Sequence, residues 1–175
     1  MDGAIPYGSP DYFILLSVLA FSRAMDFLST RLATPNLILE GNPVAKKLGW
    51  KWGLPLNLAM CLGFAAWPLS AIVISTTSIL VAAHNFQNGW LMRSMGEENY
   101  RDWHVARIRE TKVSLYLLCL FGQTTLTAGV GGAVIYFSDP ALLIPQAIGY
   151  GIVGYATAVA FFTLLSVWRL RRALG

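Results

Sequence analysis

Long apolar runs separated by short polar segments make up most of this chain. The runs lack the strict apolar–polar alternation of an outer-membrane barrel strand, and a helix satisfies every backbone N–H and C=O group within its own segment. The pattern predicts an all-α integral membrane bundle in a single domain, residues 1–175, with about five transmembrane helices. We place these helices at 12–32, 52–67, 69–92, 113–137 and 141–168, and a cytoplasmic interfacial amphipathic helix at about 97–110.

The run 52–92 can be divided in two ways. As a single helix it would be about 60 Å long, twice the thickness of a bilayer core. Pro68 is a strong helix breaker in its middle, and residues 52–67 alone give about 24 Å of helix, which can span with local thinning. We predict five spans with a turn near Pro68. The alternative has four spans, with 52–92 as one kinked helix.

The distribution of charge favours five spans. With five spans and the N-terminus outside, all 13 Lys and Arg residues lie on the inner side or in the inner half of the first helix, as the positive-inside rule requires. With one kinked span, the lysines of the connector 33–51 would lie on the opposite side from the basic segment 93–112. We therefore expect a protein of the plasma (inner) membrane with an outer N-terminus and a cytoplasmic C-terminus.

Composition agrees with a membrane protein. Hydrophobic residues make up 55% of the chain and charged residues 13%, where a soluble domain has about 25% charged residues. The net charge of +4 comes from basic residues scattered between apolar runs, so topology explains it and nucleic-acid binding is not expected. Cys61 and Cys119 lie in separate apolar runs, which is typical of small buried hydrophobic residues rather than a disulfide.

The last two predicted helices each carry a face of small residues, and such faces let membrane helices approach closely. We expect the two helices to form a hairpin packed through these faces, which could also bind a second copy or another membrane partner. The residues are Gly122, Thr125, Gly129 and Gly132 on one helix and Ala147, Gly151, Gly154 and Ala158 on the other.

Polar residues gather in the second half of the first helix. Arg23, Asp26 and Thr30 recur at i, i+3 and i+7, so they share a face that cannot look at lipid. One interpretation is an ion pair within the helix between Arg23 and Asp26. The other makes Asp26 a proton carrier, a cation ligand or an acid/base group whose ionisation Arg23 tunes.

The sequence HNFQN at 84–88 brings more polar groups to the same cytoplasmic half. His84 and Asn88 are four residues apart and share a helix face. Four polar side chains in five residues cannot all face lipid without a large cost, which indicates a site. The other interpretation is that this segment is only the inner end of the span reaching the lipid headgroups.

The connector contributes Glu40, Asn42 and Pro43. We expect Asn42 to cap a short interfacial helix that has Pro43 at its first position. Glu40 could fold back toward the charged face of the first helix, where a set of Asp, Glu and His side chains could bind a divalent cation or perform acid/base work.

These residues predict a polar site open to the cytoplasm. No catalytic residue can be assigned and no cofactor is required, since no ligand spacing is diagnostic of a metal. The expected function is transport or binding of an ion, a proton-coupled solute or a lipid headgroup; the alternatives are a membrane enzyme acting on lipid headgroups and a structural subunit. The binding candidates are Asp26, Thr30, Glu40, Asn42, His84 and Asn88, with Arg23 tuning, and Asp26, Glu40 and His84 as the set for any metal.

The order Asp26-x-x-Ser29-Thr30, then Glu40-Gly-Asn42-Pro43, then two more spans ending in an Asn-containing segment, resembles an uncharacterised prokaryotic family of small polytopic membrane proteins. Its members share an intramembrane Asp followed by a Glu-x-Asn-Pro turn. The resemblance covers about 23–88 and leaves out the last two helices. It implies that these positions matter and implies nothing about the substrate.

Overall fold

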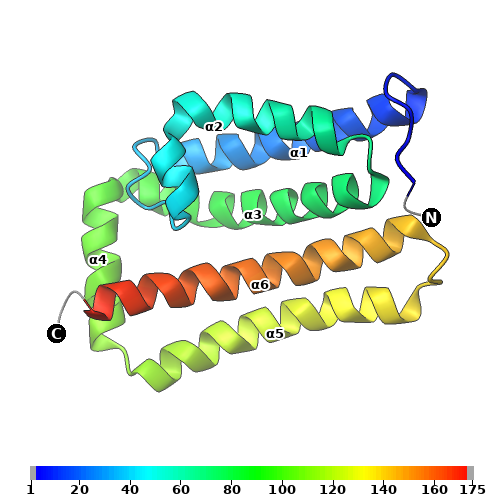
Figure 1. Ribbon diagram of the computed structural model, residues 1–175. Coiled ribbons are helices and arrows are strands. Elements are labelled where there is room, and N and C mark those ends of the chain that lie inside the picture. The colour runs from blue at the N-terminus through cyan, green and yellow to red at the C-terminus, as the bar shows by residue number, and fades with distance from the viewer. Residues whose placement is uncertain (1–2, 173–175) are drawn as a thin grey trace.

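Six helices form the part of the chain that the computed structural model describes, residues 3–172 (Figure 1). The predicted all-α class is confirmed for these residues. Four of the helices, α1, α3, α5 and α6, contain stretches long and apolar enough to cross a membrane, which indicates a multi-pass membrane protein. The helices are α1 (Pro10–Ala33), α2 (Pro43–Phe64), α3 (Pro68–Met95), α4 (Glu97–Glu110), α5 (Val113–Phe137) and α6 (Leu143–Arg172).

Five of these helices lie side by side and α4 crosses one end of them (Figure 1). α4 has the bounds expected of the interfacial helix. It carries exposed ion pairs, such as Arg107 with Glu110. Its position at the membrane surface stays a prediction.

The chain breaks and reverses at 65–67, between α2 and α3. The alternative of a single kinked helix over 52–92 is therefore wrong. Pro68 stands at the first turn of α3, where a missing N–H costs nothing. α2 begins at Pro43, nine residues before the helix predicted from 52, and bends at Gly49, which has a φ of 62°. Much of the expected connector 33–51 is thus the first part of α2.

α1 and α3 run parallel and pack through residues spaced alternately by three and four. The buried residues of α3 are Ala71, Ser75, Ser78, Ala82 and Gly89. Small side chains let the two backbones approach; a Cβ at Gly89 would lie 3.1 Å from Leu32 of α1. This seam was not predicted, although its spacing is visible in the sequence.

α6 lies between α3 and α5, and two of its glycines face opposite neighbours. A Cβ at Gly149 would lie 2.9 Å from the carbonyl oxygen of Gly131 in α5, and one at Gly151 would lie 2.6 Å from Cβ of Thr76 in α3. Two residues apart on a helix means nearly opposite faces. The side-chain hydroxyl of Thr77 donates to the carbonyl oxygen of Gly151 at 3.1 Å.

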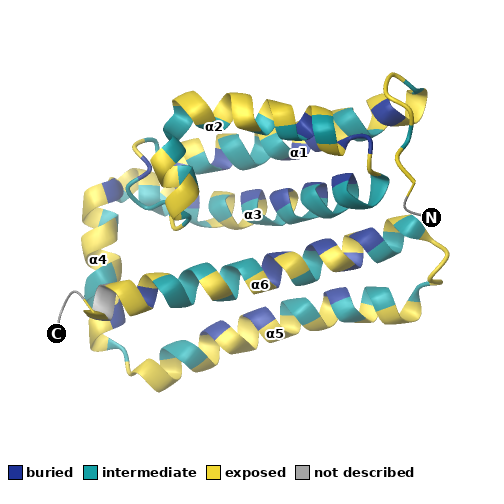
Figure 2. Cartoon of the chain, in the orientation of Figure 1, coloured by how far each residue is buried: buried dark blue, intermediate teal, exposed yellow. Residues whose placement is uncertain are grey.

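The predicted packing of α5 through Gly122, Thr125, Gly129 and Gly132 is wrong. Nothing approaches a Cβ at Gly122, Gly129 or Gly132 within 4 Å, and exposed residues cover this side of α5 (Figure 2). Gly131, on the other side, makes the contact with α6. Cys119 is also exposed, whereas Cys61 is buried as expected. On the predicted face of α6, Gly151 lies against Thr76 of α3. Partner binding through the outer face of α5 stays a prediction.

Candidate functional site

Arg23 links the first three helices at the middle of α1. Its Nη1 donates to Asp26 Oδ2 at 2.7 Å and to Ser78 Oγ of α3 at 3.0 Å. Its Nε donates to Asn57 Oδ1 of α2 at 2.7 Å, and Nη2 also donates to Asn57. The predicted ion pair within α1 is confirmed. One guanidinium thus ties three helices together, as its fork of donors allows.

Asp26 keeps a free acceptor. Only its Oδ2 is hydrogen-bonded among the described residues, and the side chain retains 16% exposure. Glu40 lies near enough for its charge to act on Asp26. The Glu40 Oε1 atom accepts the backbone N–H of Asn42 at 2.7 Å, and Glu40 forms no ion pair within residues 3–172. With each group ionised, the formal charges of Arg23, Asp26 and Glu40 sum to −1.

A second polar layer lies one turn nearer the C-terminal end of α1. Asn85 Nδ2 of α3 donates to Ser29 Oγ at 3.3 Å and to Thr30 Oγ1 at 3.1 Å. Ser29 Oγ donates in turn to the carbonyl oxygen of Asp26 at 2.9 Å. Thr30, a predicted site residue, thus contacts α3, and its partner is Asn85.

His84 and Asn88 do not join this layer. The His84 side chain is exposed on the side of α3 away from the seam, and Asn88 Nδ2 donates to the carbonyl oxygen of His84 within the helix. The metal set Asp26, Glu40 and His84 is wrong, since no three His, Cys, Asp or Glu side chains gather as a metal site within the described chain.

Asn42 and Pro43 have the predicted local role. Asn42 Oδ1 accepts the N–H of Val44 at 3.0 Å and caps α2, and Pro43 occupies the first turn. This cap is confirmed. It fixes the point where the connector becomes helix, close to Glu40.

Asn57, Ser78 and Asn85 were not among the predicted site residues. Asn57 is the only amide side chain in the apolar run 54–66, and a lone Asn at membrane depth needs a polar partner. Ser78 and Asn85 lie on the three-four spacing of the α3 seam. Both signals were available before the structure.

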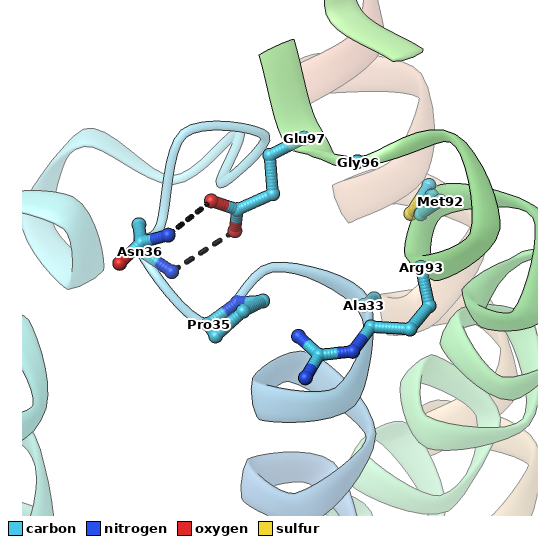
Figure 3. A pocket seen from close by; sticks show the side chains of 7 residues that line it. All are labelled: Ala33, Pro35, Asn36, Met92, Arg93, Gly96 and Glu97. Atoms are coloured by element: carbon cyan, nitrogen blue, oxygen red, sulfur yellow. Dashed lines mark hydrogen bonds between the residues drawn. The ribbon is translucent and has the colours of Figure 1, made fainter. Parts of the chain in front are cut away.

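A pocket of about 210 Å³ opens where α1 and α3 end and α4 begins (Figure 3). Ala33, Pro35 and Met92 form its apolar part, and Asn36, Arg93 and Glu97 supply polar groups. None of its polar residues was a predicted candidate. Basic and acidic residues are common at helix ends, so the sequence does not distinguish these residues from others. Only the structure shows that they line one pocket.

Glu97, the first residue of α4, holds the connector between α1 and α2, residues 34–42, against α4. Its two carboxylate oxygens accept the backbone N–H and the side-chain Nδ2 of Asn36, each at 2.9 Å (Figure 3). Burial acts to raise the pKa of Glu97, but hydrogen bonds from Thr34 and Asn36 and the charge of Arg93 together lower it. Glu97 is therefore ionised at neutral pH.

We expect the contribution of Glu97 to stability to depend on pH. Because its folded pKa lies below the ordinary value of 4.5, its stabilisation is complete above pH 4.5 and is lost as the pH falls through the folded pKa. Charge-assisted hydrogen bonds predict a loss of about 2 kcal/mol for Glu97→Gln at neutral pH. Thermal unfolding in detergent across pH checks this, with the exposed Glu98→Gln as the control. A gap between wild type and Glu97→Gln that widens at acid pH would contradict it.

Comparison with protein-family models, curated proteins and solved structures gives no match for this chain. Function is therefore inferred from the geometry of the residues. The described chain is helical, with four apolar helices of membrane-spanning length. One of these helices, α1, contains the ion pair between Arg23 and Asp26.

Proposed function

We propose that this protein binds a proton or a small monovalent cation at Asp26 and carries it across a membrane. The observation that supports this most is the net charge of −1 on Arg23, Asp26 and Glu40. Arg23 already donates four hydrogen bonds, to Asp26, Asn57 and Ser78. Glu40 places a second negative charge near Asp26, and a nearby like charge favours the binding of a proton or a cation there.

The arrangement of α1, α2 and α3 supports five crossings. α1 and α3 run parallel, as the contacts of Arg23 with Ser78 and of Thr30 with Asn85 require. Two parallel spans need a return path between them. α2 runs back along α1 (Figure 1), with Tyr12 bonded to Leu62 and Arg23 to Asn57. Five crossings put the termini on opposite sides, and the positive-inside rule then gives an outer N-terminus in a plasma (inner) membrane.

The proposed path of the ion begins at the connector. Glu40 lies on the cytoplasmic side of Asp26 and attracts a cation by its charge. The free Oδ1 of Asp26 then accepts the proton or coordinates the cation, while Oδ2 keeps its bond to Arg23. The hydroxyl groups of Ser29 and Thr30 stay bonded to Asn85, which holds α1 and α3 together while Asp26 changes its charge.

Flux measurements test this proposal. Protein in proteoliposomes, with an enclosed dye that responds to H⁺, Na⁺ or K⁺ and an imposed gradient of the same ion, should give flux above empty liposomes. Asp26→Asn keeps an oxygen for Arg23 but removes the charge, so we expect flux to fall at least about tenfold. Asp139→Asn, in the exposed turn between α5 and α6, should leave flux unchanged.

Two outcomes would contradict the transport proposal. One is wild-type protein that gives no flux of any of the three ions while remaining folded in the liposomes. The other is Asp26→Asn protein with wild-type flux. Circular dichroism and a thermal melt of each variant separate loss of flux from loss of fold.

A structural role is the second candidate, favoured by the bonds of Arg23 to three helices. In that case the charged cluster only locks α1, α2 and α3. Asp26→Asn would then lower the unfolding temperature, and the folded wild type would carry no ion. The same two measurements distinguish the two roles.

A further inference from the structure

The pocket at the inner ends of α1 and α3 lies at the expected depth of the lipid headgroups. It follows directly on the apolar part of α3 and precedes the charged helix α4. Trp90, just before the pocket, is 68% exposed, and Trp103, just after it, is 43% exposed. Exposed tryptophans gather at membrane–water interfaces, so a ligand in this pocket would come from that layer.

The pocket presents two opposite charges that do not pair with each other. Arg93 and Glu97 both line it (Figure 3), and the charge of Arg93 acts on Glu97. No ion pair joins them within the described chain, and Arg93 donates no hydrogen bond there. Gly96, with a φ of 80°, turns the chain between them, and a side chain in this left-handed conformation would be strained.

Each charged group retains unused bonding capacity. The guanidinium of Arg93 has five N–H donors. Glu97 accepts hydrogen bonds from Asn36 and Thr34, and its two oxygens together can accept about four. The Oδ1 atom of Asn36 is an additional acceptor. A ligand that fits must therefore carry an anion and a hydrogen-donating cation a few ångströms apart.

We propose that this pocket binds the headgroup of an aminophospholipid, with the phosphate on Arg93 and the primary ammonium on Glu97. Ala33, Pro35 and Met92 pack against the carbon atoms of the headgroup. Asn36 and Glu97 hold the connector to α4, so the bound lipid stabilises the same junction. The site is separate from Asp26 and does not depend on ion transport.

Three lipids distinguish the contribution of the phosphate from that of the ammonium group. Phosphatidylethanolamine has both groups. Phosphatidylcholine keeps the phosphate, but its quaternary ammonium cannot donate a hydrogen bond to Glu97. Phosphatidylglycerol lacks the cation, so Glu97 repels it. Free phosphoethanolamine has the same charges without the acyl chains, and it distinguishes a lipid site from a site for a soluble zwitterion.

The experiment is native mass spectrometry of full-length protein released from nanodiscs of equimolar mixed lipids. We expect retained phosphatidylethanolamine to exceed phosphatidylcholine and phosphatidylglycerol about tenfold, the value of one charge-assisted hydrogen bond. Arg93→Gln should abolish this preference, and Arg31→Gln, at the exposed inner end of α1, should keep it. Glu97→Gln should lose discrimination between ethanolamine and choline, and Glu98→Gln should keep it.

Several results would overturn the proposal. Equal retention of the three lipids by folded wild type excludes the site, and preference for phosphatidylglycerol excludes the role of Glu97. Equal effects of Arg93→Gln and Arg31→Gln indicate only diffuse surface charge. Displacement of the lipid by an equal concentration of free phosphoethanolamine excludes a lipid source. Glu97→Gln removes a charge that holds the junction between the connector and α4. If Glu97→Gln protein unfolds at a lower temperature than wild type, the lipid preference of Arg93→Gln alone tests the proposal.

Discussion

Arg23→Met is expected to destabilise the protein by about 3 kcal/mol. The change leaves Asp26 without its cation and removes the donors that bond Asn57 and Ser78. The side chains of Arg23 and Asp26 retain 22% and 16% exposure, so the lower end of the range for buried pairs applies. Unfolding by increasing mole fraction of SDS measures the loss.

The paired replacement Arg23→Met with Asp26→Leu tests the cause. Removing both charges leaves no unpaired ion, so the double variant should be more stable than Arg23→Met alone by at least about 1 kcal/mol. The control is the paired replacement Arg101→Met with Asp102→Leu, because Arg101 and Asp102 form an exposed ion pair on α4. The interaction energy between these two replacements should be below about 1 kcal/mol. If the double variant at positions 23 and 26 is no more stable than Arg23→Met, the ion pair is not what Arg23 contributes.

Gly149→Ala is expected to cost about 1–3 kcal/mol, although it adds a single methyl group. Its Cβ would lie 2.5 Å from Cγ1 of Ile135 and 2.9 Å from the backbone oxygen of Gly131. A side chain can rotate away, but the backbone of α5 has to move. The same SDS titration measures the change.

Gly122→Ala is the matched control for Gly149→Ala. It lies on α5, and a Cβ there would meet nothing within 4 Å, so its stability should stay within about 0.5 kcal/mol of wild type. Equal effects of the two substitutions would show that α5 and α6 do not pack closely through Gly149. They would also show that the outer face of α5 is as tightly packed as the inner one.

Local features of the sequence predicted several parts of the structure. Pro68 marks the break between α2 and α3, because its ring excludes it from a helix interior. Asn42 and Pro43 begin α2 by capping. Arg23 and Asp26 form an ion pair because residues three apart meet on one helix. Each of these depends on only a few neighbouring residues.

The predictions that failed concern which side of a helix faces which neighbour. His84 and Asn88 were expected to share a polar site with residues of α1, yet Asn85 is the residue that contacts α1. Adjacent residues on a helix differ by about 100° in direction, so the rotation of α3 about its axis decides whether His84 or Asn85 faces α1. The small face of α5 was placed on α6, and the structure uses Gly131 instead. Because α5 has small residues on both faces, the sequence does not show which face packs against α6.

By itself, the sequence determined that this is a helical, multi-pass membrane chain with an ion pair inside its first helix, because hydropathy, proline and residues one turn apart act locally. Only the tertiary structure decided that Asn57 and Ser78 share Arg23, that Asn85 bonds Thr30, and that Arg93 and Glu97 line one pocket. The rotation and register of each helix follow from all its contacts at once. Those contacts join residues far apart in the chain, and no local pattern records them.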